Sequence, residues 1–284
     1  MTVDSDLQQQ HRYPSLRRPH DQVRPLNVAV REPVTDLGGE AEPVPDPDTL
    51  EFGGRRSDKK ATPADRRVLR QALAHLDRTT LVGKRDAALM LLGHAIASRG
   101  SELAPLDWPA SFAELPNGGF RVRVYRKKRK RWQDVEVLVD PEPEMCTVAA
   151  VRDLVDALAQ EGQTCGPLFL RIDQWGYMGA EMTRNGKPIG DPTGRISVNG
   201  AADVVSRSIT RAGLPGEWRS HSLRRGFVKS ARDAGVDIVD IGRHGGWDDR
   251  SKALIGYVDE EDSSGERNPL AQIGKAAVER RTLK

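Results

Sequence analysis

Apolar residues recur at helical spacing along most of this chain, and this recurrence restricts the fold more than any other feature of the sequence. Between residues 147 and 160, Val151, Leu154 and Leu158 return every three or four positions, so they lie on one face of a helix. The same spacing predicts helices that begin at the N-cap residues Thr62 and Asn199, and others over 85–97, 220–235, 237–242, 248–258 and 269–278.

One stretch breaks the helical pattern and predicts a β-hairpin. Phe120, Val122 and Val124 alternate with polar residues, and a second alternating run starts at Val135. The sequence RVRVYRKKRKR, residues 121–131, holds eight basic residues and no acidic one. Such a run is also compatible with a solvated surface or a localisation tail, but a basic turn between strands is suited to contacting a phosphate backbone. The expected fold class is mainly α with a small antiparallel β-sheet, an α+β arrangement.

Composition excludes several classes of protein. The 284 residues suffice for one large domain or two small ones. No apolar run approaches the roughly 20 residues of a membrane span and the amino terminus is polar, so we expect a cytoplasmic protein without a membrane partner. Cys146 and Cys165 form neither a metal-ligand pattern nor a disulfide framework, so we expect no metal site.

Residues 1–56 differ from the rest of the chain. They contain seven of the eighteen prolines and show no apolar periodicity, which is typical of a disordered arm. We therefore expect one folded domain over residues 57–284.

The predicted helix at 220–235 begins with an unusual amount of positive charge. Its sequence is SHSLRRGFVKSARDAG, and Ser220 or Ser222 can cap its amino end. His221 and Arg224 lie three residues apart, so they share a face. Cations at a helix start oppose the helix dipole, and a sequence tolerates this most readily when an external anion such as phosphate lies between them. A solvated basic first turn is the alternative explanation.

Four other features extend this constellation. Arg99, in the stretch ASRGSELAPLDW, follows an apolar helix and precedes a short capped helix start. Lys127 and its neighbours lie at the hairpin turn. Trp247 follows two glycines in HGGW, which allow a close approach of the backbone and the indole. Tyr257, one of only four tyrosines, lies ten residues after Trp247. We interpret His244 in the same motif as structural.

The order of these features resembles the tyrosine recombinases, also called phage integrases. The match consists of SRGSELAPL, a lysine in a two-stranded turn, HSLR at 221–224, GGW at 245–247 and the tyrosine of IGYV, and it covers about residues 60–284. GGW rather than GH resembles the Cre-like phage branch. The resemblance implies the fold of a tyrosine recombinase catalytic domain.

This resemblance also implies a chemistry. Arg99 and Arg224 would hold the non-bridging oxygens of a phosphodiester, because two guanidinium forks can donate several charge-assisted hydrogen bonds. Tyr257 would attack the phosphorus and keep the DNA as a 3′-phosphotyrosyl ester. The reaction needs neither ATP nor a metal, so no cofactor is expected.

Three other side chains complete the implied set. His221 is the candidate base or hydrogen-bond donor, and Trp247 would pack against the phosphate and donate its indole N–H. Lys127 is the expected general acid for the leaving 5′ oxygen, with Lys128 and Lys130 as alternatives at the same turn.

Nearby cations are expected to contact DNA without reading its sequence. They are Arg126, Lys128, Arg129, Lys130, Arg131 and Arg225. The resemblance further implies double-stranded DNA as the partner and a homo-oligomer on it, a tetramer on two DNA sites, with the helix at 269–278 docking on a neighbour.

Two features depart from the family pattern. Residues 1–56 are too short and too rich in proline for the helical core-binding domain of relatives, which points to an accessory protein or a full-length recombinase as a further partner. The interval from Trp247 to Tyr257 is one residue longer than expected, and Gly256 weakens the helix before the nucleophile. We therefore expect Tyr257 to be mobile until DNA binds.

The sequence thus predicts a site-specific DNA recombinase that serves integration, excision or resolution of a mobile element. It would be cytoplasmic and associated with the nucleoid when bound to DNA. The alternatives are a catalytically inactive DNA-binding module of the same fold and a type IB topoisomerase-like relaxing enzyme.

Overall fold

The computed structural model describes residues 60–179, 182–248 and 251–259. The arm predicted over 1–56 and the helix predicted over 269–278 lie outside these ranges. The described chain forms the helices α1 (Arg66–Ala74), α2 (Leu81–Ala95), α3 (Gly100–Leu103), α4 (Thr147–Gln160), α5 (Val198–Arg211), α6 (Ser220–Asp233), α7 (Ile238–Gly245) and α8 (Lys252–Asp259).

The strands form three small antiparallel sheets. The largest has the order β2 (Phe112–Glu114), β3 (Phe120–Arg126), β4 (Arg131–Val137), and its last two strands are the predicted hairpin. The other sheets pair β1 (Asp107–Trp108) with β5 (Gly166–Pro167) and β6 (Met182–Arg184) with β7 (Lys187–Ile189). The fold is mainly helical as predicted, although the sequence analysis expected a single small sheet.

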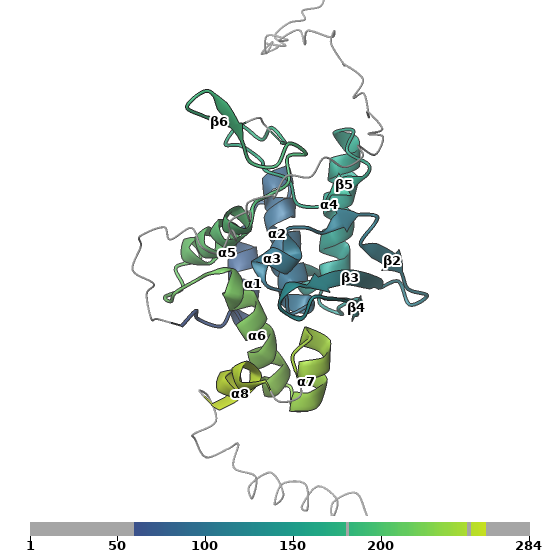
Figure 1. Cartoon of the computed structure of the whole chain (residues 1–284), viewed down its shortest axis with the longest axis vertical. Helices are drawn as coiled ribbons and strands as arrows, with labels where there is room; N and C mark the ends of the chain where they lie inside the picture. The colour runs from purple at the N-terminus through teal and green to yellow at the C-terminus, as the bar shows by residue number, and fades with distance from the viewer. Residues whose placement is uncertain (1–59, 180–181, 249–250, 260–284) are drawn as a thin grey trace, which may run out of the picture. The chain divides into compact units, whose positions relative to one another are not determined.

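Helix α2 lies at the centre of the folded part (Figure 1). Its side chains Leu89, Met90 and Leu92 are fully buried, and it packs against α4, α5 and α6. A helix that is apolar around most of its circumference is stable only when other elements surround it. The position of α2 therefore fixes α6, which carries three of the predicted site residues, His221, Arg224 and Arg225.

Charged side chains inside this core are paired. Arg85 Nε lies 2.7 Å from Asp86 Oδ1, and Arg207 Nη2 of α5 lies 2.8 Å from Asp86 Oδ2. Arg85 Nη1 also donates to the carbonyl oxygen of Leu170 at 3.0 Å. A buried charge without a partner would cost several kcal/mol, so this cluster helps to hold α5 against α2.

A second, smaller cluster joins the helices at the carboxyl-terminal end of the described chain. Val228 of α6, Ile241 of α7 and Leu254 of α8 are buried together with Trp247, and Tyr257 packs against them. Figure 1 shows α7 and α8 on either side of α6. This packing sets the position of Tyr257 relative to the first turn of α6.

Two predicted N-caps are wrong, and a third prediction is confirmed in part. Asp65, whose carboxylate accepts from Val68 N, caps α1, whereas Thr62 Oγ1 accepts from Glu217 N at 2.9 Å. Ser197 rather than Asn199 caps α5. The N-cap residue of α6 is Arg219, and the predicted cap Ser222 accepts from its backbone N–H, through Oγ at 3.0 Å.

Helix α2 starts four residues before the predicted position. Thr80 Oγ1 accepts from Gly83 N at 3.1 Å and caps the helix there.

Candidate active site

Arg99 stands at the junction between α2 and α3. It is the N-cap residue of α3, and its backbone N–H donates to Glu102 Oε2 at 3.2 Å. Its Nη1 donates to Glu102 Oε1 at 2.7 Å, while about a quarter of its side chain stays exposed (24%). Glu102 therefore fixes one side of the Arg99 guanidinium, and the other side is exposed to solvent.

Arg224 lies in the first turns of α6 and is almost fully buried. Its Nη1 donates to the carbonyl oxygens of Ala97 and Gly245, the latter at 2.9 Å. Its Cζ lies 3.5 Å from the ring centroid of Trp247, a cation–π contact. Its Nε and Nη2 have no hydrogen-bond partner among the described residues. Buried donors of this kind are costly unless an acceptor reaches them, so the geometry suits an incoming oxyanion.

The indole ring of Trp247 packs closely against Gly245, the first of the two glycines that precede it. A side chain at Gly245 would put its Cβ 1.7 Å from the indole ring, so the ring packs directly on the glycine backbone. Gly246 adopts a left-handed conformation with φ of +69° at the end of α7. The indole Nε1 is buried and, within the described chain, has no acceptor. The N–H that the sequence analysis assigned to a phosphate is thus available for one.

Glu102 is the functional residue whose importance the sequence analysis missed. Its carboxylate is fully buried and binds Arg99, and it also accepts from Arg126 Nη1 at 3.0 Å. Arg224 Nη1 lies 3.9 Å away. Burial raises the pKa of Glu102, but the guanidinium groups of Arg126 and Arg99 outweigh burial and hold it below its usual value. The spacing of three residues after Arg99 was the available signal.

Arg126 was predicted to contact DNA, and the structure corrects this assignment. Its side chain is 1% exposed. Besides Glu102, it donates to the carbonyl oxygens of Ile96 at 3.0 Å and His244 at 3.2 Å, and its Nε donates to Gln133 at 2.9 Å. All three guanidinium nitrogens are therefore engaged inside the protein, and Arg126 fastens the hairpin to the segments that carry Arg99 and Trp247.

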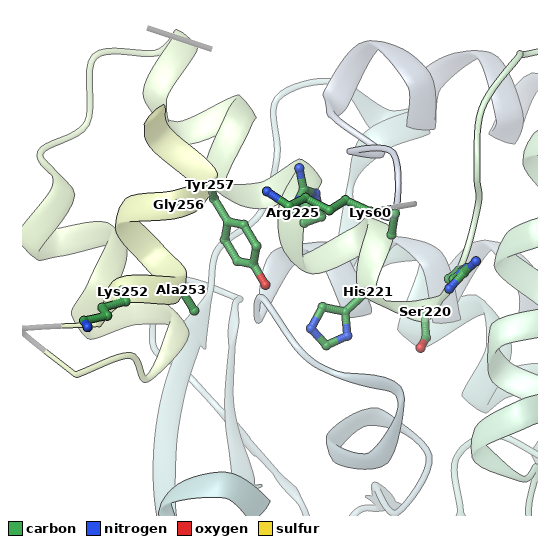
Figure 2. A pocket seen from close by; sticks show the side chains of 10 residues that line it. Lys60, Ser220, His221, Arg225, Lys252, Ala253, Gly256 and Tyr257 are labelled. Atoms are coloured by element: carbon green, nitrogen blue, oxygen red, sulfur yellow. The ribbon is translucent and has the colours of Figure 1, made fainter. Parts of the chain in front are cut away.

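His221 and Tyr257 line a common basin of about 590 Å³. In Figure 2 the Tyr257 hydroxyl points toward the His221 ring. Burial lowers the pKa of His221, and the charges of Arg99, Arg224 and Arg225 lower it further. The imidazole is therefore neutral at pH 7 and able to accept a proton.

Tyr257 is held by two contacts. Its ring meets the edge of Trp247 with centroids 6.2 Å apart at 81°, and Arg225 Cζ lies 4.9 Å from its centroid. Arg225 therefore lies beside the tyrosine in this structure rather than at a separate surface. Lys60 and Lys252 line the same basin (Figure 2).

A second hollow, of about 270 Å³, brings the two predicted arginines together. Arg99, Arg224 and Trp247 line it. Lys128 and Arg129 from the hairpin turn line it as well, whereas Lys127 lines a different hollow of about 540 Å³. The structure thus brings Lys128, not Lys127, to the paired arginines.

The other predicted DNA contacts lie at the hairpin turn. Lys130 and Arg131 are exposed, and Lys130 adopts a left-handed conformation with φ of +48°. Arg129 Nη2 forms an ion pair with Asp248 Oδ2 at 2.9 Å. His244, interpreted as structural, stacks on Phe227 with ring centroids 4.7 Å apart.

Within the described ranges, no group of three or more His, Cys, Asp or Glu side chains could hold a metal ion. The same part of the chain contains no helix long and apolar enough to cross a membrane. Cys146 and Cys165 are both free thiols, the first buried at the start of α4 and the second exposed.

Comparison with known proteins shows what the chain is similar to in sequence and in fold. No family model matches the chain. An integrase/recombinase XerD homologue from Selenomonas ruminantium is 29% identical over 170 residues, which are 59% of this chain and 45% of that protein. The XerH recombinase bound to palindromic difH DNA, in a post-cleavage complex, superimposes with a TM-score of 0.51 at 16% identity over 77% of this chain and 53% of that one.

The chain is therefore similar in sequence to an integrase/recombinase and in fold to a site-specific recombinase. The predicted fold class is confirmed, since the described chain is mainly helical with small antiparallel sheets and superimposes on that recombinase. The chain spans about half the length of these relatives. A pre-cleavage complex of XerH superimposes less well, with a TM-score of 0.49 at 16% identity over 70% of this chain and 50% of that one. The assignment to the Cre-like branch stays a prediction.

Proposed function

We propose that this chain is a site-specific DNA strand transferase that cleaves and rejoins DNA through Tyr257. One observation carries the proposal. Arg224 Nε, Arg224 Nη2 and Trp247 Nε1 are donors with no acceptor among the described residues. Their side chains line one hollow with Arg99, and Tyr257 packs against Trp247. A phosphodiester supplies the negatively charged oxygens that such donors need.

The arginines would act on the charge that grows during the reaction. In the pentacovalent transition state the non-bridging oxygens carry more negative charge than in the ground state. Arg99 and Arg224 are fixed beforehand by Glu102 and by backbone carbonyls, so they need little reorganisation when that charge appears. Removal of one such donor typically costs about 3 kcal/mol of transition-state stabilisation.

Strand cleavage exchanges one ester for another. The Tyr257 oxygen forms a bond to phosphorus, its proton passes to His221 or to solvent, and the bond from phosphorus to the 5′ oxygen breaks. The leaving oxygen takes a proton from a lysine. We favour Lys128 for this role over Lys127, because Lys128 lines the hollow with both arginines. Attack of a 5′ hydroxyl on the phosphotyrosyl ester reverses these steps and rejoins the strand.

The test is a covalent trap. Nicked duplexes prepared from genomic fragments flanking the gene lose the leaving strand after cleavage, so the phosphotyrosyl adduct accumulates and survives denaturation. The wild-type chain should form the adduct and Tyr257→Phe should not. Tyr177→Phe, at an exposed tyrosine in another part of the fold, is the matched control and should react normally.

The same assay separates the alternatives. A mobility shift without any adduct from the wild-type chain would contradict the proposal and indicate a DNA-binding module. Relaxation of supercoiled plasmid irrespective of sequence would indicate a topoisomerase. Integration, excision or resolution of a mobile element, assembly as a homotetramer, and a further recombinase or accessory partner all belong to this proposal and depend on its outcome.

A further inference from the structure

The outward face of the hairpin carries an aromatic pair that strand cleavage does not use. Tyr125 of β3 stands directly opposite Trp132 of β4, with ring centroids 5.2 Å apart and tilted by 59°. Tyr125 is 41% exposed and Trp132 is 58% exposed. Neither ring contributes to the hydrophobic core of the described chain, so packing does not explain their presence.

Cationic side chains lie beside this aromatic pair. Arg123 Cζ lies 5.1 Å from the ring centroid of Trp132, a cation–π distance. Lys127, which does not face the paired arginines, lines the hollow in front of the two rings. An apolar face with a positively charged edge is complementary to a ligand that has a flat apolar part joined to a negative group.

The hollow itself lies between the rings and the segment around α3. It measures about 540 Å³, and its lining also includes the apolar residues Pro105, Leu106 and Val198. Glu102, which holds Arg99, also lines it. The hollow therefore adjoins the side chain that holds Arg99, and its size suits one nucleotide.

We call the ring pair of Tyr125 and Trp132 the aromatic platform. We propose that an unpaired base of the cleaved strand stacks on this platform inside the hollow. The proposal rests on the proposed function, because exchange of strands requires bases next to the break to leave their partners. In an intact duplex the faces of each base are covered by its neighbours in the stack. An unpaired nucleotide can stack its base on aromatic rings and place its phosphate near cations. Arg123 and Lys127 supply those cations.

The test measures preference for unpaired DNA and needs no knowledge of the target sequence. Fluorescence anisotropy at one fixed salt concentration compares a labelled 20-base-pair duplex with the same duplex carrying one extra unpaired thymine. The full chain with Tyr257→Phe is used, so that no covalent adduct forms. It should bind the bulged duplex about tenfold or more tightly than the paired duplex, as expected from base stacking on an aromatic ring.

Variants in this background locate the site. Trp132→Ala and Tyr125→Ala should abolish the preference, and Trp132→Phe should retain most of it. Trp175→Ala is the matched control, because Trp175 is exposed (73%) and has no ring or cation contact among the described residues. It should leave the preference intact. Both platform residues are exposed, so loss of their cross-strand contact should lower the melting temperature by only a few degrees, and weaker binding then cannot be attributed to misfolding.

Several outcomes would overturn the inference. Equal binding of both duplexes, or a preference that persists in Trp132→Ala and Tyr125→Ala, would exclude the platform as a base site. If Trp132→Ala changed the oligomeric state and left the preference intact, the face would be a protein interface instead. The covalent trap at Tyr257 reports separately on the proposed function. A chain that forms the adduct but shows no preference for the bulged duplex would contradict the platform inference and leave the proposed function standing.

Discussion

A single carboxylate, that of Glu102, determines how the guanidinium groups around the site are arranged. It binds Arg99 and Arg126 directly and lies 3.9 Å from Arg224. Three cations so close to each other would repel if no anion lay among them. Glu102 therefore allows positive charge to accumulate next to a site that we expect to hold a phosphate.

Glu102→Gln tests this role at the level of stability. The amide keeps the shape of the side chain but leaves the buried guanidinium groups without a counter-charge, so we expect a loss of about 3–5 kcal/mol in the free energy of unfolding. Urea denaturation at pH 7 measures the loss. Glu136→Gln is the control, because Glu136 pairs with Arg121 on the exposed face of the hairpin, where ion pairs contribute about 0–1 kcal/mol. Equal midpoints for the two variants would contradict the assigned role.

Pairs of elements are held together by groups that the sequence pattern does not display. His94 of α2 lies 5.9 Å from Phe227 of α6, edge to face, and Phe227 stacks on His244 of α7. Burial lowers the pKa of His94 to about 4 and lowers the pKa of His244 as well. Both imidazoles are therefore neutral where α2, α6 and α7 meet.

This arrangement predicts a loss of stability in mild acid. Because the pKa of His94 is lower in the folded chain than the value of about 6.5 in the unfolded chain, its contribution is complete above pH 6.5 and is lost as the pH falls toward 4. At pH 5 the loss should be about 1–2 kcal/mol. Urea denaturation at pH 7.5 and pH 5 would measure it, and His94→Gln should reduce the difference. His75→Gln, at an exposed histidine, should not.

Elements with strong local patterns were predictable from the sequence. Helix α4 has the predicted bounds because its apolar residues follow one face. Buried and exposed residues alternate strictly along β3, and they alternate along the second half of β4, where Val135 and Val137 are buried. The strands β2, β6 and β7 have three residues each, too few to show a period, and were missed. Short strands depend on pairing with residues elsewhere in the chain.

The site was predictable as a set of residues but not as a geometry. Arg126 continues the alternation of Val122 and Val124 and so points inward, yet its position in a basic run suggested a DNA contact. The choice between Lys127 and Lys128 depends on how the 3₁₀ turn at 127–129 directs each side chain. The importance of Glu102 depends on Arg126 and Arg224, which lie 24 and 122 residues further along the chain.

For the molecule as a whole, the cations near the site come from segments distant in sequence. Lys60 precedes α1, Arg225 lies on α6, Lys252 lies on α8, and Lys128 lies on the hairpin. Only the folded chain brings them to adjacent hollows. A net charge of +3 therefore conceals a local concentration of positive charge, and binding of DNA should depend on salt more strongly than the net charge implies.

Lys252→Gln tests this expectation. Removal of one phosphate contact should weaken binding of DNA to a similar extent whatever the sequence, and should reduce the slope of log K against log salt concentration by about 1. Binding measured by anisotropy between 50 and 300 mM salt, about the range in which such slopes are determined, would show the change. Lys187→Gln, on β7, is the control. An unchanged slope for Lys252→Gln would show that DNA does not contact the basin lined by His221, Tyr257 and Lys252.

The donors on Arg224 and Trp247 that find no acceptor among the described residues have a consequence for the protein without DNA. Any tetrahedral oxyanion that fits between them binds only the folded chain, so sulfate or vanadate should raise the melting temperature more than chloride at equal ionic strength. Arg224→Lys and Trp247→Phe should reduce that increase. Measuring the melting temperature at increasing anion concentration would thus give the affinity of these donors for an inorganic oxyanion, without knowledge of the DNA target sequence.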